Sequence, residues 1–219
     1  VATGIAQIHA RHPHTTAAAQ KTLHEASGGR FLLGLGVSHA PFIEGSRKLP
    51  YRTPYTDMIE YLAAMREAPF NACAADDEPP TVLAALGPKM LRLAATETQG
   101  AHPYFSPVEH TALALVDNDR TRAHELAAHH MRRYLRLPNY ANNLLRFGFT
   151  DDDVAGPSTR LIEAIVVCGD VDAVVSRVRE QHDAGADHVC VQVLTVGSDQ
   201  IPLQHWADLA DALDAASGA

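Results

Sequence analysis

The stretch Gly28-Gly29-Arg30-Phe31-Leu32-Leu33-Gly34-Leu35-Gly36-Val37-Ser38-His39-Ala40-Pro41 decides the fold. It combines a glycine turn, a continuous apolar run and a polar exit. An apolar run of this length, bounded by glycines, predicts a strand that is covered on both faces. Such strands occur mainly in parallel α/β sheets and barrels, which carry their chemistry at the carboxyl ends of the strands. The stretch therefore predicts both an architecture and the edge of a site.

Outward from this stretch, predicted strands alternate with predicted helices. Strands are predicted at 1–8, 31–37, 81–86, 100–105 and 188–194, and loops at 38–53 and 139–150. Helices are predicted at 14–27, 54–67, 87–99, 107–115, 118–137 with Asn118 as cap, 158–167, 171–184 with Asp170 as cap, and 203–216. This β-α-β-α order indicates a parallel sheet with right-handed crossovers. Since a complete barrel takes about 250 residues, we expect residues 1–219 to form a single, incomplete TIM (β/α)8 barrel domain.

Composition narrows the class of partner. The formal net charge of −8 argues against nucleic acid, whose phosphates require a basic face. No window is long and apolar enough to span a membrane, so we expect no membrane partner. Three widely separated cysteines indicate reduced thiols in the cytoplasm rather than a disulfide framework. Cys168 and Cys190 lie in apolar runs, which predicts that both are buried.

Three segments are candidates for chemistry. The glycines before Ser38 and His39 allow a flat ligand to approach the backbone, and His39 at a strand end can exchange a proton near neutral pH. Gly87-Pro88-Lys89-Met90 starts a helix after a strand, where free N–H groups and a lysine suit phosphate. Gly4 inside an apolar strand indicates a bulge or a close backbone contact. The alternatives are structural: a tight strand exit, a chain break before a helix and a packing glycine.

The histidines do not predict a metal site. The chain has 13 of them, but His12-Pro13-His14 and His129-His130 do not have the spacing of ligands on one helix face. No quartet of histidines and cysteines occurs. We therefore expect no structural metal.

Taken together, several segments resemble the bacterial luciferase-like superfamily, in particular its coenzyme F420-dependent oxidoreductases. They are Val1-Ala-Thr-Gly-Ile5, Gly29-Arg-Phe-Leu-Leu-Gly-Leu-Gly36, Val82-Leu-Ala-Ala-Leu-Gly-Pro-Lys-Met90 and Gly185-Ala-Asp-His-Val189. The phrases Leu137-Pro-Asn-Tyr140 and Gly148-Phe-Thr-Asp-Asp-Asp153 resemble an actinobacterial subgroup of that family.

The resemblance implies a TIM barrel that binds coenzyme F420, or alternatively FMN, at its carboxyl face. The strand around Thr3, Gly4 and Ile5 would form a bulge, often with a non-prolyl cis peptide, behind the cofactor ring. His39 falls where some relatives place an acidic proton donor. Further contacts would come from Gly36, Val37 and Ser38 at the ring, and from backbone N–H groups of Gly87, Pro88, Lys89 and Met90 at the phosphate.

The sequence departs from this family in two places. Relatives have a β-α-β segment before the position of Val1, and an extra loop and strand near Leu115–Asn118, so we expect both to be missing here. The leading hypothesis is hydride transfer between F420 and a small organic substrate in a homodimer. The alternatives are an FMN-dependent monooxygenase and a non-catalytic cofactor-binding or partner subunit. Phe42, Tyr51 and Tyr55 either line a substrate pocket or pack under a loop.

Overall fold

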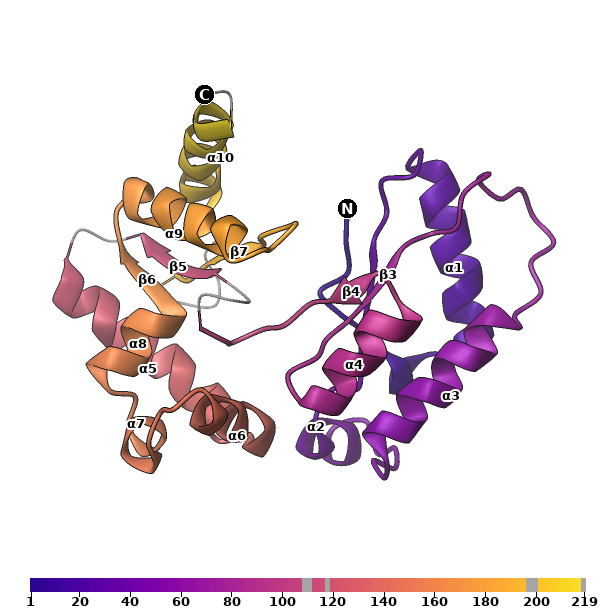
Figure 1. Cartoon of the computed structure of the whole chain (residues 1–219), viewed down its shortest axis with the longest axis horizontal. Coiled ribbons are helices and arrows are strands. Elements are labelled where there is room, and N and C mark those ends of the chain that lie inside the picture. The colour runs from indigo at the N-terminus through magenta and orange to yellow at the C-terminus, as the bar shows by residue number, and fades with distance from the viewer. Residues whose placement is uncertain (108–111, 117–118, 196–200, 218–219) are drawn as a thin grey trace. The chain divides into compact units, whose positions relative to one another are not determined.

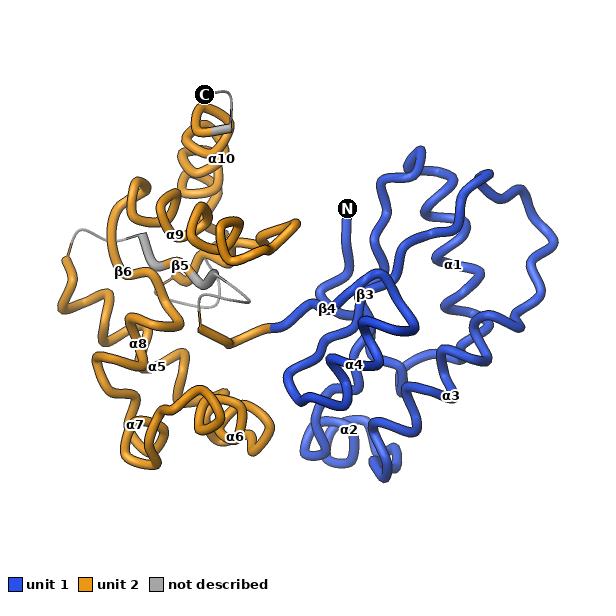
Figure 2. Tube along the Cα trace, viewed as in Figure 1, with its two compact units in different colours: residues 1–103 blue, residues 104–219 orange. Residues whose placement is uncertain are grey.

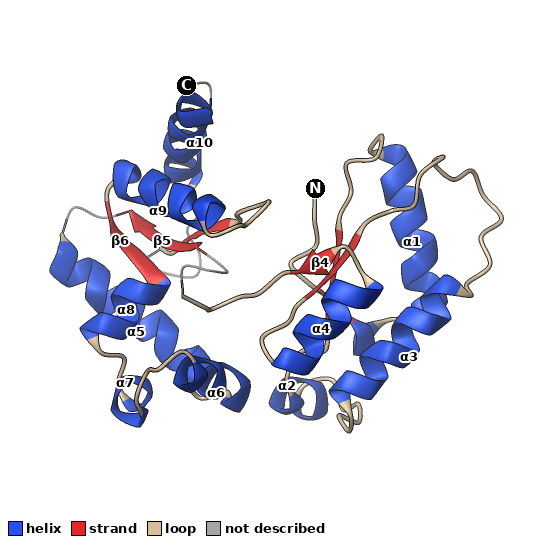
Figure 3. Ribbon diagram, viewed as in Figure 1, coloured by secondary structure: helices blue, strands red, loops and turns tan. Residues whose placement is uncertain are grey.

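Parallel strands and covering helices alternate along most of the chain, as the computed structural model shows (Figure 1). The structure describes residues 1–107, 112–116, 119–195 and 201–217. The chain divides into two compact units, residues 1–103 and 104–219 (Figure 2). Each unit has its own parallel sheet with helices packed on it, so the units are described separately (Figure 3).

Unit 1 contains a four-stranded parallel sheet in the order β1-β2-β3-β4. Its strands are β1 (Ala6–Gln7), β2 (Leu33–Gly36), β3 (Thr81–Leu83) and β4 (Gly100–Ala101). Its helices are the short 3-10 helix η1 (Ile8–Ala10), α1 (Pro13–Ala26), α2 (Ala40–Gly45), α3 (Pro54–Arg66) and α4 (Pro88–Glu97). Spatial order follows chain order, as expected for successive β-α units.

The two faces of β2 are both covered, as the apolar run predicts. Leu33 and Leu35 lie in the core of unit 1, together with Met58 and Leu62 of α3 and Leu93 of α4. The glycines that alternate with them, Gly34 and Gly36, are also buried, on the opposite face of the sheet. Helices therefore cover one face, and the residues before β1 cover the other.

The predicted bulge is present before β1. Ala2 pairs with Leu32, and Ala6 pairs with Leu35. The chain thus advances four residues on the β1 side (2 to 6) against three on the β2 side (32 to 35), so one residue is extra. The Gly4–Ile5 peptide bond within this stretch is cis, as the resemblance implies.

Unit 2 contains a three-stranded parallel sheet in the order β6-β5-β7. Its strands are β5 (Ala112–Val116), β6 (Val166–Gly169) and β7 (Val191–Val193). Its helices are α5 (Arg120–Leu135), α6 (Pro138–Arg146), α7 (Asp151–Ala155), α8 (Thr159–Ile165), α9 (Val171–Asp183) and α10 (Leu203–Ser217). Ala114, Val167, Val174 and Leu209 form the core between the sheet, α9 and α10.

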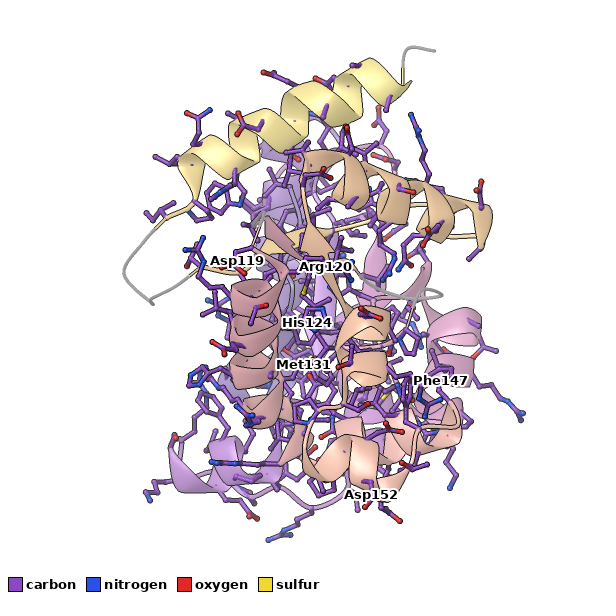
Figure 4. All side chains as sticks on the ribbon, turned by 90° about the vertical axis from the view of Figure 1, so that its left-hand side faces the viewer. Asp119, Arg120, His124, Met131, Phe147 and Asp152 are labelled. Atoms are coloured by element: carbon purple, nitrogen blue, oxygen red, sulfur yellow. The ribbon has the colours of Figure 1, made fainter. Side chains whose placement is uncertain are left out.

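Side-chain caps mark the first residues of two helices in unit 2. Asp170 accepts a hydrogen bond from the Ala173 N–H and caps α9, as predicted. The cap of α5 is Asp119, whose carboxylate accepts from the N–H groups of Thr121 and Arg122. The prediction of Asn118 as this cap is therefore wrong, and Asn118 itself lies outside the described residues. Figure 4 shows α5 with Asp119, Arg120, His124 and Met131 in succession along it.

Five further sequence predictions need correction. The loop 38–53 contains α2, and the loop 139–150 contains most of α6, each of which has a proline in its first turn. The predicted helix 107–115 is wrong, because 112–116 form β5, the central strand of its sheet; 108–111 lie outside the described residues. The predicted helix 158–167 ends at Ile165, where β6 begins one residue later. Cys168 is half-buried, but Cys190 is exposed, which overturns its predicted burial.

The fold class is α/β, with parallel strands joined by helices, and it corresponds to an incomplete barrel. Within the described residues, the strands form two sheets, one in each unit. The single-domain assignment for 1–219 stays a prediction. No helix of the described part is long and apolar enough to cross a membrane. Nor do three metal-ligating side chains gather anywhere in that part.

Candidate functional site

The carboxyl end of β2 turns sharply at Ser38. Its φ of 61° lies in the left-handed region, which is uncommon for a residue with a side chain. Two contacts hold it there: Gln7 Nε2 donates to Ser38 Oγ at 3.4 Å, and the Tyr51 hydroxyl donates to the Ser38 carbonyl at 3.1 Å. The neighbouring Val37 packs against the core of unit 1. The Ser38 side chain therefore lies at the carboxyl end of the strands, beside Gln7, whereas the Val37 side chain packs toward the helices.

Gly34 and Gly36 are required by close approach of the chain before β1. A Cβ at Gly34 would overlap the Thr3 carbonyl oxygen. A Cβ at Gly36 would lie 2.6 Å from Ile5 Cδ1 and 2.7 Å from Ile5 Cγ1. Since real side chains do not approach this closely, both positions admit only glycine unless the neighbours shift. The space over Gly36 that was predicted for a flat ligand is taken by Ile5.

Thr3 joins the bulge to β2 through its side chain. Thr3 Oγ1 donates to the Gly34 carbonyl at 2.8 Å and accepts from the Gly34 N–H at 2.9 Å. Thr3 is half-buried, whereas Gly4 after it is exposed. The Gly4–Ile5 peptide thus lies on the face of the sheet opposite the helices, and it is open to solvent at Gly4.

The start of α4 is open. Gly87 is its N-cap, with no side chain capping the helix, and an added Cβ there would meet no atom within 4 Å. Pro88 and Lys89 are exposed, and Met90 is half-buried. The prediction that a backbone N–H of Pro88 binds the phosphate is wrong, because proline has no N–H to donate. Donors are left at Gly87, Lys89 and Met90, with the Lys89 ammonium beside them.

His39 is the N-cap residue of α2. Its backbone is extended (φ −134°, ψ 142°), and its carbonyl accepts from the N–H groups of Phe42 and Ile43. The side chain is half-buried and makes no capping hydrogen bond to the helix. His39 thus stands one residue beyond Ser38, at the edge where the parallel strands end.

The sequence interpretation missed His102. This residue follows β4, and its N–H donates to the Leu83 carbonyl at 2.7 Å. Although β1 and β4 are the outer strands of the sheet, His102 Nε2 would be 3.7 Å from a Cβ at Gly4. The sheet is therefore curved enough for the imidazole to reach the bulge. The predicted strand 100–105 places His102 inside the strand, whereas β4 ends at Ala101, so the position of His102 at a strand end was missed.

The three candidate aromatic residues differ. Tyr51 is half-buried and donates to Ser38, and burial together with the nearby Asp57 carboxylate raises its pKa. Its ring also lies 5.5 Å from the His9 ring. Phe42 and Tyr55 are exposed, at 42% and 37%. Tyr51 therefore contacts a predicted site residue through its side chain, whereas Phe42 bonds to His39 through its backbone N–H.

A separate shallow pocket of about 310 Å³ lies between η1, α1 and α3. His9, Asp57, Glu60 and Tyr61 are among its lining residues. His9 Nε2 is 3.6 Å from Asp57 Oδ2. None of the predicted site residues lines this pocket.

The structure thus brings part of the predicted set into direct contact. Thr3 and Ile5 contact the β2 glycines, and Ser38 is bonded to Gln7 at the end of β1. Gly87 to Met90 lie beyond the end of β3. They share an edge with Ser38 and His39 because the strands are parallel. All of these residues belong to unit 1.

Comparison with solved structures gives likeness over most of the chain. The coenzyme F420-dependent tetrahydromethanopterin reductase of Methanopyrus kandleri is 20% identical, covers 95% of this chain and 80% of its own, and has a TM-score of 0.63. An F420-dependent secondary alcohol dehydrogenase with an F420–acetone adduct is 15% identical, with coverages of 88% and 73% and a TM-score of 0.66.

A third neighbour is the oxygenating constituent of 3,6-diketocamphane monooxygenase of Pseudomonas putida, in complex with FMN. It is 14% identical, covers 95% of this chain and 76% of its own, and has a TM-score of 0.56. Identities this low show a shared fold. No curated protein matches the chain in sequence.

The family comparison is more specific. The model of the luciferase-like monooxygenases matches residues 1–125 of the 219, a range that includes every predicted site residue. Because this match spans more than half of the chain, the chain belongs to the luciferase-like monooxygenase family and is an oxidoreductase of that type.

Proposed function

We propose that the protein is an F420-dependent oxidoreductase that transfers hydride between the deazaflavin and a small organic substrate. The observation that carries the proposal is a combination of three features in unit 1. A bulge with an exposed Gly4 precedes β1, His39 follows β2, and an uncapped helix start at Gly87 follows β3 of the same parallel sheet. Two structural neighbours are named as F420-dependent enzymes, which supports the choice of cofactor.

The residues present fit a tricyclic ring with a phosphate tail. Gly4 is exposed, so a flat ring can lie against the Gly4–Ile5 peptide without meeting a side chain on that residue. His102 borders this position. At α4, the space where a Gly87 side chain would stand is empty, and no side chain caps the first N–H groups in the described structure. An oxyanion can therefore approach the helix start closely, where the helix dipole favours it.

Each group of residues has a distinct task in this proposal. Gly87, Lys89 and Met90 bind the phosphate through N–H groups, the Lys89 ammonium adds charge, and Pro88 fixes the backbone at the first turn. The bulge supports one face of the ring, while Val37 and Ser38 border it. The bound deazaflavin supplies or accepts the hydride. His39 donates or removes the proton at the substrate oxygen bonded to the carbon that exchanges hydride.

A fluorescence titration of the protein with coenzyme F420 tests the proposal. We expect saturable binding at micromolar concentrations, followed by a change in F420 absorbance when a substrate is reduced. A chain that shows no F420 binding at these concentrations contradicts the proposal. FMN is titrated in parallel, so that the two cofactors are compared on the same preparation.

An FMN-dependent monooxygenase is the second candidate. The neighbour in complex with FMN supports it, because FMN also combines a tricyclic ring with a phosphate. Tighter binding of FMN than of F420, together with activity that requires oxygen, identifies this function instead. A chain that binds either cofactor but has no turnover with any alcohol or carbonyl substrate supports the third reading, a non-catalytic cofactor-binding or partner subunit.

We also propose that the protein acts as a homodimer in the cytoplasm. Its net charge of −8 and its free cysteines are compatible with that setting. Sedimentation equilibrium at micromolar concentration distinguishes a dimer from a monomer. A monomer at all concentrations contradicts the proposal.

A further inference from the structure

Arg47, in the loop that follows α2, is held in place by two neighbours. Its Nε donates to Gln7 Oε1 at 2.9 Å. Its guanidinium carbon lies 5.3 Å from the centre of the Phe42 ring. A hydrogen bond at one edge and an aromatic ring under the plane fix the orientation of a guanidinium.

This arrangement connects Arg47 to the predicted site. The Gln7 carboxamide accepts from Arg47 with its oxygen and donates to Ser38 Oγ with its nitrogen. Gln7 ends β1, and Ser38 follows β2. The guanidinium is therefore linked by hydrogen bonds, through the Gln7 side chain, to Ser38, the residue that precedes His39.

The outer edge of the guanidinium is available for a ligand. Arg47 is exposed, and within the described part of the chain Gln7 is the one side chain that accepts a hydrogen bond from it. Of the acidic residues close to Arg47 in the sequence, Asp57 accepts from Thr53 and lies beside His9. Glu44 on α2 forms no ion pair with Arg47 in that same part. The two Nη groups thus keep their donors.

Charge around Arg47 favours an anion. The segment 46–52 carries Arg47, Lys48 and Arg52, all exposed, in a chain whose formal net charge is −8. Three cations in so short a segment raise the local concentration of anions. A planar guanidinium fork matches a carboxylate or phosphate with two parallel hydrogen bonds.

We propose that Arg47, oriented by Gln7 and Phe42, binds an oxyanion of the ligand in the candidate site, and that this oxyanion is a carboxylate or phosphate of the substrate. The inference rests on the proposed function for the identity of the site. It assigns the oxyanion to the substrate because the cofactor phosphate has its own donors at the start of α4. The substrate class is therefore a small anionic alcohol or carbonyl compound.

Inorganic phosphate is the probe for the site itself. The protein is labelled with ¹⁵N-arginine, and the Arg47 Nε–H signal is assigned by its loss in Arg47→Lys. We expect this signal to shift and saturate on titration with phosphate. Gln7→Ala should weaken the apparent affinity several-fold, because it frees the guanidinium without removing it. A shift that grows without saturation, or no shift, overturns the proposal.

Arg30 is the matched control. It is an exposed arginine at the amino end of β2, and its Nε also donates to an oxygen, the Ser27 carbonyl at 2.9 Å. We expect its signal to stay unmoved, and Arg30→Ala to leave phosphate binding at Arg47 intact. Equal saturable shifts of both arginines overturn the proposal, since they show general anion attraction.

A second experiment tests whether Arg47 binds the substrate or the phosphate tail of the cofactor. Arg47→Ala should bind coenzyme F420 as tightly as the unaltered protein. If its affinity for F420 falls about tenfold while its affinity for the deazaflavin chromophore without the phosphate tail does not, the guanidinium binds the tail and the substrate assignment is overturned. Failure of the unaltered protein to bind F420 overturns the proposed function, but the phosphate titration still decides whether Arg47 forms an oxyanion site.

Discussion

The Ile5 side chain occupies the space that a side chain at Gly36 would need. Its Cδ1 and Cγ1 atoms lie 2.6 and 2.7 Å from the position of a Gly36 Cβ. We therefore expect Gly36→Ala to lower the free energy of unfolding by about 1–3 kcal/mol through overpacking. Gly34→Ala should cost more, because its Cβ would overlap a backbone atom, the Thr3 carbonyl oxygen, which moves less easily.

Urea denaturation followed by circular dichroism measures both effects. Gly45→Ala is the control, since its Cβ would meet nothing within 4 Å. In an Ile5→Ala background, the Gly36→Ala penalty should shrink, which a double-mutant cycle reports as coupling. A Gly36→Ala variant as stable as Gly45→Ala would contradict the close packing of Ile5.

Gly87→Ala separates cofactor binding from folding. The Gly87 backbone (φ −86°, ψ 151°) suits alanine, and the added Cβ has open space, so stability should change by less than about 0.5 kcal/mol. The same methyl group stands where a phosphate would approach the helix start. We expect the affinity for F420 to fall about tenfold, whereas Gly45→Ala keeps both properties. Unchanged F420 affinity in Gly87→Ala would remove the helix start from the site.

His39→Ala tests the proton-transfer role. Removing a positioned acid or base lowers turnover by about a hundredfold or more, while F420 affinity should stay within about threefold, because His39 contributes to the substrate side. Steady-state kinetics with the identified substrate and fluorescence titration with F420 give the two values. A large loss of F420 affinity with little change in turnover would assign His39 to binding.

Acid should destabilise unit 2 through His130. His130 Nε2 lies 3.4 Å from the Tyr104 hydroxyl, and burial, followed by the Arg133 and His129 charges, lowers the pKa of His130 from 6.5. The unfolded chain therefore binds this proton more tightly than the folded chain. The corresponding stability is present above about pH 6.5 and is lost as the pH falls toward the folded-state pKa.

Thermal unfolding at pH 7.5 and 5.5 measures that loss. His130→Gln should reduce the difference between the two melting temperatures, because the titrating group is gone. His188→Gln, which alters an exposed histidine of the same unit, should leave the difference unchanged. Equal pH dependence in the unaltered protein and in His130→Gln would contradict the assignment.

Thiol reactivity should follow burial. Burial, with the nearby Glu163 carboxylate, raises the pKa of Cys168 to about 11. Only about one part in a thousand is then thiolate at pH 8, so iodoacetamide should modify Cys168 far more slowly than the exposed Cys73. Peptide mass spectrometry over time gives both rates, and the rate at Cys168 should rise about tenfold per pH unit. Similar rates at the two cysteines at pH 8 would be the contrary result.

Local signals in the sequence predict much of the fold. Pro54 and Pro88 in first turns, Asp170 as a cap and the glycines after Ala26 place α3, α4, α9 and the end of α1 within one or two residues. These features act through neighbouring backbone groups, so a single sequence contains them. The apolar run at β2 likewise depends on composition alone.

The errors have a different origin. The segment around Ala112–Val116 is a short apolar run that is equally compatible with a buried helix, and it forms a strand because β6 and β7 pair with it on both sides. His102 reaches Gly4 only because the sheet curves. Both outcomes depend on pairings between residues far apart in the chain, which a local pattern does not contain.

The Thr3 hydroxyl has a consequence for how the protein can change over time. At the bulge, the regular pairing between the strands is interrupted, and Gly34 would otherwise present both an N–H and a carbonyl with no partner on that side. One hydroxyl serves both groups. Serine preserves this exchange, whereas valine, nearly identical in shape, leaves two polar groups unmatched. The bulge therefore constrains position 3 to a side chain with a hydroxyl group, through the two polar groups of Gly34.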